Sequence, residues 1–322
     1  MTCRSEDVLR RSLFDDATEI HDRDPIGEMM HDRQIVTDQD QCQAELALQA
    51  RKQVQDLSLH RNVESGSRLI THKDLEQPEN LRIYHWASTQ HFATPLPIKP
   101  ARGISQTYFN IAASSMLFRA TLDNLDNWVS GRSMPPESHM PRSADGTLVP
   151  FENWLKQFPV IQGVMLPRGP SRLELMDFGE EIDRGILTKE PPEVISGKEY
   201  AVQVPAVDHD GNEIAGIRVP MVRAPLGTYT GWALRAETFG NGALLGITGS
   251  YIPFPNCEDE RAQLRDPRPS IIARYSNREG YQEAIAAAAK ALITQGVMLE
   301  EDLPRCLAAA ENWGQPRHIV RL

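Results

Sequence analysis

Two stretches of the chain repeat apolar residues with the spacing of an α-helix. The first spans residues 111–130 and is followed by Gly131, at the place where helices often end in glycine. Its apolar positions recur at intervals of three or four residues: Phe118, Leu122, Leu125 and Val129. The second spans residues 279–295 and is followed by Gly296. Its apolar positions lie on one helical face: Tyr281, Ile285, Ala289 and Leu292. The spacing predicts a helix in each stretch.

Other stretches have the composition of β-strands. Residues 81–88 (LRIYHWAS) are β-branched and aromatic and follow the turn-like sequence QPEN, so they predict a buried strand. Residues 200–220 hold two extended runs on either side of Asp210-Gly211, a dipeptide typical of hairpin turns. The proline-dense middle of the chain predicts long loops. The whole pattern favours an α/β fold with a reduced sheet, flanking helices and a large loop-rich elaboration that contains a β-hairpin.

Composition divides the chain in two. Residues 1–67 are polar and acidic, which predicts a lead that is partly disordered or helical, and residues 68–322 predict a compact domain. The chain is 40% hydrophobic, enough to bury a core. Its net charge of −10 and its lack of a basic stripe argue against nucleic acids and anionic membranes as partners. No apolar run is long enough for a membrane span and no secretory signal is visible, so we expect a cytoplasmic protein.

Several patterns that would indicate a bound metal or cofactor are incomplete. The four cysteines are far apart and form no C-x-x-C pair, so we expect reduced thiols and no zinc site. His85 and His91 have the spacing of neither a helix face nor a strand face. The run 208–213 (DHDGNE) resembles a calcium loop, but it lacks the distant glutamate and is better explained as a hairpin turn. The glycines of 240–246 lack the strand and helix of a dinucleotide site, so we predict no cofactor.

His91 is the candidate catalytic residue. It follows the predicted strand 81–88 directly, and the histidine of a serine–histidine–acid relay needs a loop at such a place to exchange protons. A histidine at the end of a strand is more commonly an ordinary surface residue. No G-x-S-x-G occurs, and Ser105, the nearest imitation, follows a proline-rich loop instead of a strand. Four aromatic residues are candidates for lining a substrate pocket, although core packing explains them equally well: Trp86, Tyr229, Trp232 and Tyr251.

Several segments, taken in order, resemble the α/β-hydrolase-domain family, in particular its C-terminal portion. They include PENLRIYHWASTQH (78–91), the hairpin VPAVDHDGNEIAGIRVP (204–220) and APLGTYTGWALR (224–235), and the resemblance covers about residues 68–305. It implies a partial hydrolase-like sheet and serine-hydrolase chemistry in which His91 is the catalytic base. The acid of the relay would be Glu64, with Asp56 as a second candidate. The family's serine would lie upstream, where this sequence shows no nucleophile elbow.

Two classes of function follow from this resemblance. The first is hydrolysis of a carboxylic ester or related acyl bond in a small molecule by a truncated relative, or with a partner chain or a second copy completing the sheet. The second is a non-enzymatic binding or scaffold protein derived from a truncated hydrolase. Loss of p-nitrophenyl ester hydrolysis on replacing His91 would favour the first, and absence of both turnover and fluorophosphonate labelling would favour the second.

Overall fold

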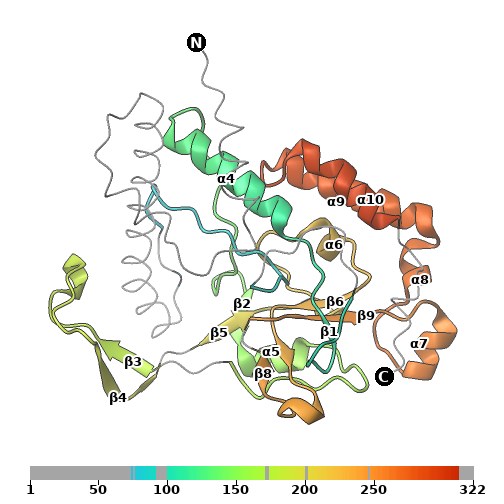
Figure 1. The fold of residues 1–322 in the computed structure, drawn as a ribbon, viewed down its shortest axis with the longest axis horizontal. Helices are drawn as coiled ribbons and strands as arrows, with labels where there is room; N and C mark the ends of the chain where they lie inside the picture. Colours follow the sequence, from blue (N-terminus) through green and yellow to red (C-terminus); the bar gives the residue numbers. More distant parts are fainter. Residues whose placement is uncertain are drawn as a thin grey trace. The chain divides into compact units, whose positions relative to one another are not determined.

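The computed structural model describes most of the chain after Asp74 (Figure 1). The described residues are 74, 77–91, 100–170, 174–199, 202–245 and 247–311. All of them belong to the unit Leu59–Leu322. The predicted boundary after residue 67 lies outside them and stays a prediction.

A three-stranded antiparallel sheet has the order β1–β9–β6, so the last of these strands in the chain lies between the other two. The strands are β1 (Tyr108–Phe109), β6 (Gly227–Thr230) and β9 (Ser250–Pro253). Tyr229 of β6 lies opposite Tyr251 of β9, and their stacked rings have centroids 5.0 Å apart. Every residue of β6 is buried, so this strand runs through the interior.

Three more pairs of short strands are also antiparallel. They are β2 (Leu148–Pro150) with β5 (Gln203–Pro205), β3 (Glu174–Asp177) with β4 (Glu193–Glu199), and β7 (Ala233–Leu234) with β8 (Leu244–Leu245). This mixture of helices and small sheets fits the predicted α/β class. The partial hydrolase-like sheet stays a prediction.

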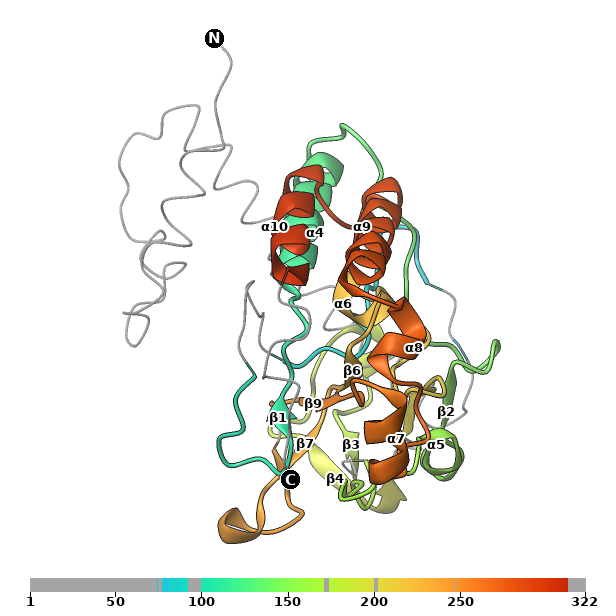
Figure 2. The ribbon, with the colours of Figure 1, turned by 90° about the vertical axis from the view of Figure 1, so that its right-hand side faces the viewer.

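Helices α4, α9 and α10 lie together on one side of the three-stranded sheet in both views (Figures 1 and 2). The helices are α4 (Ser115–Val129), α5 (Phe151–Gln157), α6 (Pro220–Arg223), α7 (Glu258–Leu264), α8 (Ile271–Tyr275), α9 (Arg278–Thr294) and α10 (Leu303–Ala310). Three short 3₁₀ turns accompany them: Ile182–Arg184, Glu237–Phe239 and Glu300–Asp302. In the part of the chain that the structure describes, no helix combines the length and the apolar character that crossing a bilayer requires.

The main hydrophobic core lies between these helices and the sheet. In this core, Leu117 of α4 and Leu292 of α9, both almost fully buried, pack in one cluster with Tyr229 and Tyr251 of the sheet. A second, smaller core forms around Trp154 of α5. Burial of apolar surface in these two clusters is the main stabilising contribution that holds the short strands in place.

Helix α9 confirms the prediction over 279–295. All four residues of its predicted face are buried: Tyr281, Ile285, Ala289 and Leu292. The side chain of Asn277 accepts a hydrogen bond from the N–H of Gly280 (2.9 Å) and caps the first turn. Gly296 follows the helix with a φ of 72°, the left-handed conformation that glycine adopts without strain.

Helix α4 confirms a helix in 111–130, but it begins at Ser115 and buries a different face. Phe118 is 50% exposed and Leu122 is 45% exposed. The residues that α4 buries are Met116, Leu117 and Ala120. Its exposed Phe118 still has a neighbour, because its ring packs edge-on against Trp86 with centroids 4.1 Å apart. The apolar spacing therefore located the helix but not its buried side.

The predicted strand 81–88 is wrong as a member of a sheet. The segment is extended, but it forms only two isolated parallel bridges, Tyr84 with His139 and Trp86 with Ile217. The N–H of Ala87 donates to the carbonyl of Ile217 (3.0 Å). These single bridges provide hydrogen-bond partners for the backbone, and among the described residues no strand extends either bridge into a ladder.

The predicted hairpin within 200–220 is confirmed at its turn and at one antiparallel bridge next to it, Val207 with Glu213. Asp208 and Asn212 close the turn through the N–H of Asp208 and the carbonyl of Asn212 (2.8 Å), and Gly211 has a φ of 81°. The arms then separate: β5 pairs with β2, whereas Ile217 pairs with the segment that contains Trp86. The turn thus carries Glu213 to the segment 84–88.

Candidate active site

The turn at Ser88 is held by hydrogen bonds to two distant segments. Ser88 is 1% exposed and has a φ of 58°, a left-handed conformation that residues other than glycine rarely adopt. Its N–H donates to Glu213 Oε2 (2.7 Å), and its Oγ accepts from the N–H of Glu213 (2.8 Å). Its carbonyl accepts from Nδ2 of Asn110 (2.8 Å). A strained residue persists only where its surroundings over-determine its conformation, and these three bonds do so.

The next two residues of the turn are bonded as well. Thr89 Oγ1 donates to the carbonyl of Trp86 (2.8 Å), and Gln90 Oε1 accepts from the N–H of Gly249 (3.3 Å). His91 comes immediately afterwards, at a bend, and its side chain is exposed. The fold therefore presents an accessible imidazole at the end of an anchored turn.

His85 and Glu213 form a histidine–carboxylate pair at the same turn. His85 Nε2 lies 2.7 Å from Glu213 Oε2, and the two side chains are 33% and 18% exposed. Burial lowers the pKa of His85, but the hydrogen bond and the negative charge of Glu213 outweigh burial and raise that pKa above its usual value. Gly216, with a φ of 91°, packs directly on His85, and a Cβ there would collide with the His85 carbonyl oxygen.

The His85–Glu213 pair predicts a pH-dependent stability. Because the pKa of His85 is raised in the folded state, the stabilisation is complete below the unfolded pKa of about 6.5 and is lost as the pH rises through the folded pKa. We expect wild type to exceed His85→Gln in free energy of unfolding by more in mildly acidic than in alkaline buffer. Urea unfolding at both pH values measures this difference, with His209→Gln as the control for loss of an exposed histidine. An excess that grows with pH would contradict the account.

A cavity of about 330 Å³ lies beside the turn. Glu213, Thr230 and Gly231 line it, and Asn110 ties this wall to the turn by donating from Nδ2 to the carbonyls of both Thr230 (2.9 Å) and Ser88. The approach is close, since a Cβ on Gly231 would lie 3.1 Å from the carbonyl oxygen of Thr89. The residues 230–231 that line the cavity therefore lie directly against the turn that presents His91.

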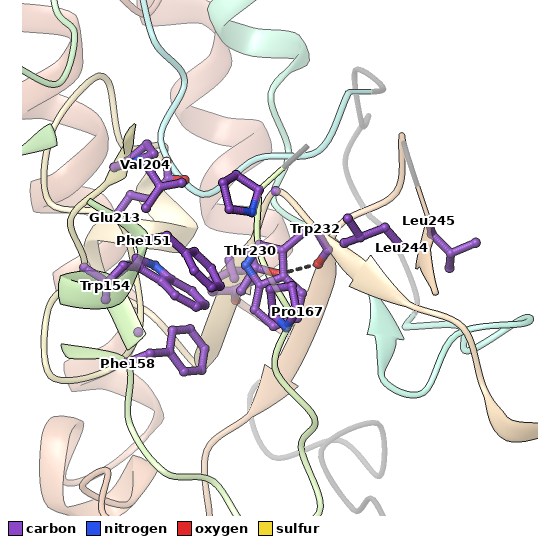
Figure 3. Close-up of a pocket in the computed structure, with 17 residues that line it drawn as sticks. Phe151, Trp154, Phe158, Pro167, Val204, Glu213, Thr230, Trp232, Leu244 and Leu245 are labelled. Atoms are coloured by element: carbon purple, nitrogen blue, oxygen red, sulfur yellow. Dashed lines mark hydrogen bonds between the residues drawn. The ribbon is translucent and has the colours of Figure 1, made fainter. Parts of the chain in front are cut away.

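Aromatic rings form much of the cavity lining (Figure 3). Phe151 stacks on Trp154 with centroids 5.4 Å apart, and Phe158 lies 4.9 Å from Trp154. Trp232 meets Trp154 edge-on at 6.0 Å. Figure 3 shows Glu213 beside Phe151, on the same side of the cavity as Trp154. The cavity thus combines apolar walls with one carboxylate.

The four aromatic residues predicted to bind substrate lie in different places. Tyr229 and Trp232 line the 330 Å³ cavity. Tyr251 is fully buried and lines a second cavity of about 720 Å³, together with Arg268. Trp86 is partly buried against Phe118 and lines neither cavity. A substrate role for each of them stays a prediction.

The predicted acids Glu64 and Asp56 are outside the described residues, so both stay predictions. Sequence reasoning missed Glu213, the carboxylate that the structure brings to the turn. Its position just after an Asp-Gly turn was visible, but its partner His85 is 128 positions away in the sequence.

The remaining polar motifs serve the fold. Ser105 is 2% exposed and forms a bridge with Arg235, and its Oγ donates to the carbonyl of Leu234 (3.3 Å). Asp210 is bound by Arg274, with Nη1 2.8 Å from its Oδ2. In the described ranges, no three histidine, cysteine, aspartate or glutamate side chains gather as a metal site would require.

Comparison with known proteins identifies a family. A family model described as alpha/beta hydrolase domain matches residues 20–308, which is most of the chain. Neither the curated proteins nor the solved structures contain a match to this chain. The match extends over the anchored turn, the His85–Glu213 pair and the aromatic cavity. The chain therefore belongs to the alpha/beta hydrolase domain family.

Proposed function

We propose that this protein hydrolyses a carboxylic ester or a related acyl bond, with His91 as the general base. The observation that carries the proposal is the anchored turn, which leaves His91 exposed directly after a residue bonded to Gly249. A general base must be accessible and held at a defined place, and the exposure of His91 and the hydrogen bonds of the turn before it support this role.

The reaction follows from the two parts of the site. An acyl group in the aromatic cavity would lie beside the turn, because Gly231 of the cavity wall approaches Thr89. His91 would withdraw the proton of an attacking hydroxyl and return it to the leaving alkoxide, so that ester and water yield acid and alcohol. The attacking hydroxyl is not that of Ser88 or Ser105, because both side chains are buried and bound within the fold.

The test is p-nitrophenyl acetate hydrolysis by the full chain, measured together with labelling by a fluorophosphonate probe. We expect turnover above the rate in buffer. Labelling in addition would identify a serine nucleophile, and turnover without labelling would identify water activated by the imidazole. Absence of both would contradict the proposal.

That negative outcome would favour a second function, a ligand-binding protein without catalysis. The specific observation behind it is that Ser88 and Ser105, the serines at and near the turn, use their hydroxyl groups in internal bonds. The cavity of about 330 Å³ would then hold a small molecule without cleaving it. Under this function, as under the first, we propose a cytoplasmic protein that acts on small molecules and not on nucleic acids.

A further inference from the structure

We infer that the aromatic cavity selects compact organic cations, such as an ammonium group, as the part of the ligand that it holds. Three features of the lining carry this inference: its charge, its rings and its size. The inference rests on the proposed function only in so far as the bound molecule would be an ester of an ammonium alcohol or acid.

The charge of the lining is one-sided. Of the described residues that line the cavity, only Glu213 has a carboxyl side chain, and burial raises the pKa of the Tyr229 phenol well above its usual value. No lysine, arginine or histidine is among them. An anion would meet the Glu213 carboxylate, whose positive partner His85 does not itself line the cavity, so anionic ligands are disfavoured.

The carboxylate has one oxygen available to a ligand. Glu213 Oε2 is committed to His85 and to the N–H of Ser88. These bonds fix the orientation of the carboxylate, so that ligand binding does not have to order this side chain. A cation that approaches from the cavity therefore meets a pre-oriented negative group.

The rings provide the rest of the attraction. Phe151, Trp154, Phe158 and Trp232 line the same cavity, with neighbouring centroids between 4.9 and 6.0 Å apart. The faces of such rings attract a cation, and tryptophan does so most strongly. A purely apolar ligand would gain from the rings but not from Glu213, so a cation of the same shape gains more.

The size of the cavity limits the ligand. About 330 Å³ is at the lower end of small-molecule sites, so the cavity fits a trimethylammonium group with a short chain better than a long acyl tail. Choline and 3,3-dimethylbutan-1-ol form a matched pair of that size, because they differ in one atom and in charge. The anion 3,3-dimethylbutanoate completes the series.

Isothermal titration of the full chain with these three probes tests the inference. We expect choline to bind about tenfold or more tightly than its neutral isostere, and the anion to bind most weakly. Glu213→Gln should weaken the binding of choline several-fold. Its affinity for the neutral isostere should be unchanged, and that result would show that the cavity is intact. Phe151→Leu, at the partly buried start of α5, should also weaken choline selectively.

Equal binding of choline and 3,3-dimethylbutan-1-ol, or no binding of choline, would overturn the inference. So would a Glu213→Gln variant that binds choline as wild type does. The proposed function fails separately: choline binding without hydrolysis of neutral p-nitrophenyl acetate would leave the inference standing and contradict catalysis. Hydrolysis of that neutral ester without a preference for choline would do the reverse.

Discussion

Replacement of His91 by alanine should lower kcat/KM for p-nitrophenyl acetate about 100-fold or more, the usual contribution of a general base. His91 is exposed and lies at the end of the turn, and substitutions of exposed residues usually change stability little, so we expect its loss to leave the fold unchanged. The rate loss would then reflect the missing proton acceptor alone.

The matched control is His209→Ala, because His209 is also exposed, with 75% of its side chain accessible, and lies on the turn before Glu213. It should hydrolyse the ester at the wild-type rate. Circular dichroism and thermal unfolding should not distinguish the two variants from wild type. A His91→Ala variant that keeps the wild-type rate would remove His91 from the mechanism.

Asp266→Ala should produce the largest loss of stability, about 3–5 kcal/mol, as expected when one member of a buried ion pair is removed. Arg268 is 1% exposed, and its guanidinium donates hydrogen bonds to both carboxylate oxygens of Asp266, at 2.9 and 2.6 Å. It also donates to the carbonyls of Ile252 and Pro253 in β9, each at 3.0 Å. Loss of Asp266 would leave a positive charge uncompensated in the interior, beside the central strand of the sheet.

Urea unfolding measures this loss, and Glu181→Ala is the control. Glu181 pairs with Arg184 at 3.0 Å on the surface, where the two side chains are 43% and 71% exposed. Exposed pairs of this kind contribute less than about 1 kcal/mol. If the two variants lost the same stability, the buried pair would not have the role that its burial indicates.

Local elements of this fold were predictable because their determinants lie close together in the sequence. Helix α9 is the clearest case: four apolar residues at helical spacing, with Gly296 after them, indicate its C-terminal end and its buried face. The turn at Asp210-Gly211 was equally visible, since the left-handed φ of Gly211 is a local requirement.

The errors came from partners that are far apart in the chain. The segment 81–88 has the composition of a strand, but whether it joins a sheet depends on His139 and Ile217, which no local pattern specifies. In α4, the spacing of Phe118 and Leu122 indicated one face, whereas tertiary packing buried Leu117 on another. Glu213 was missed for the same reason, because its role exists only after folding brings it to His85 and Ser88.

The buried Arg268 was equally invisible in the sequence. Arginine is almost never fully buried unless it is paired, so DPRP among residues 266–269 gave no reason to place it inside. The family resemblance, in contrast, was predictable and is confirmed by the match over residues 20–308. Several short segments in one order carry more information about ancestry than any single residue does about its environment.

A double-mutant cycle on kcat/KM for neutral p-nitrophenyl acetate tests the central claim most directly. The claim is that Glu213 acts on catalysis by holding the turn that presents His91, and the cycle compares wild type, His91→Ala, Glu213→Gln and the double variant. Glu213→Gln should lower the rate about tenfold when His91 is present, because misplacement of a catalytic group is costly, and should have no further effect when His91 is absent. Rate losses that simply multiply in the double variant would show that Glu213 and His91 act independently, which contradicts the account.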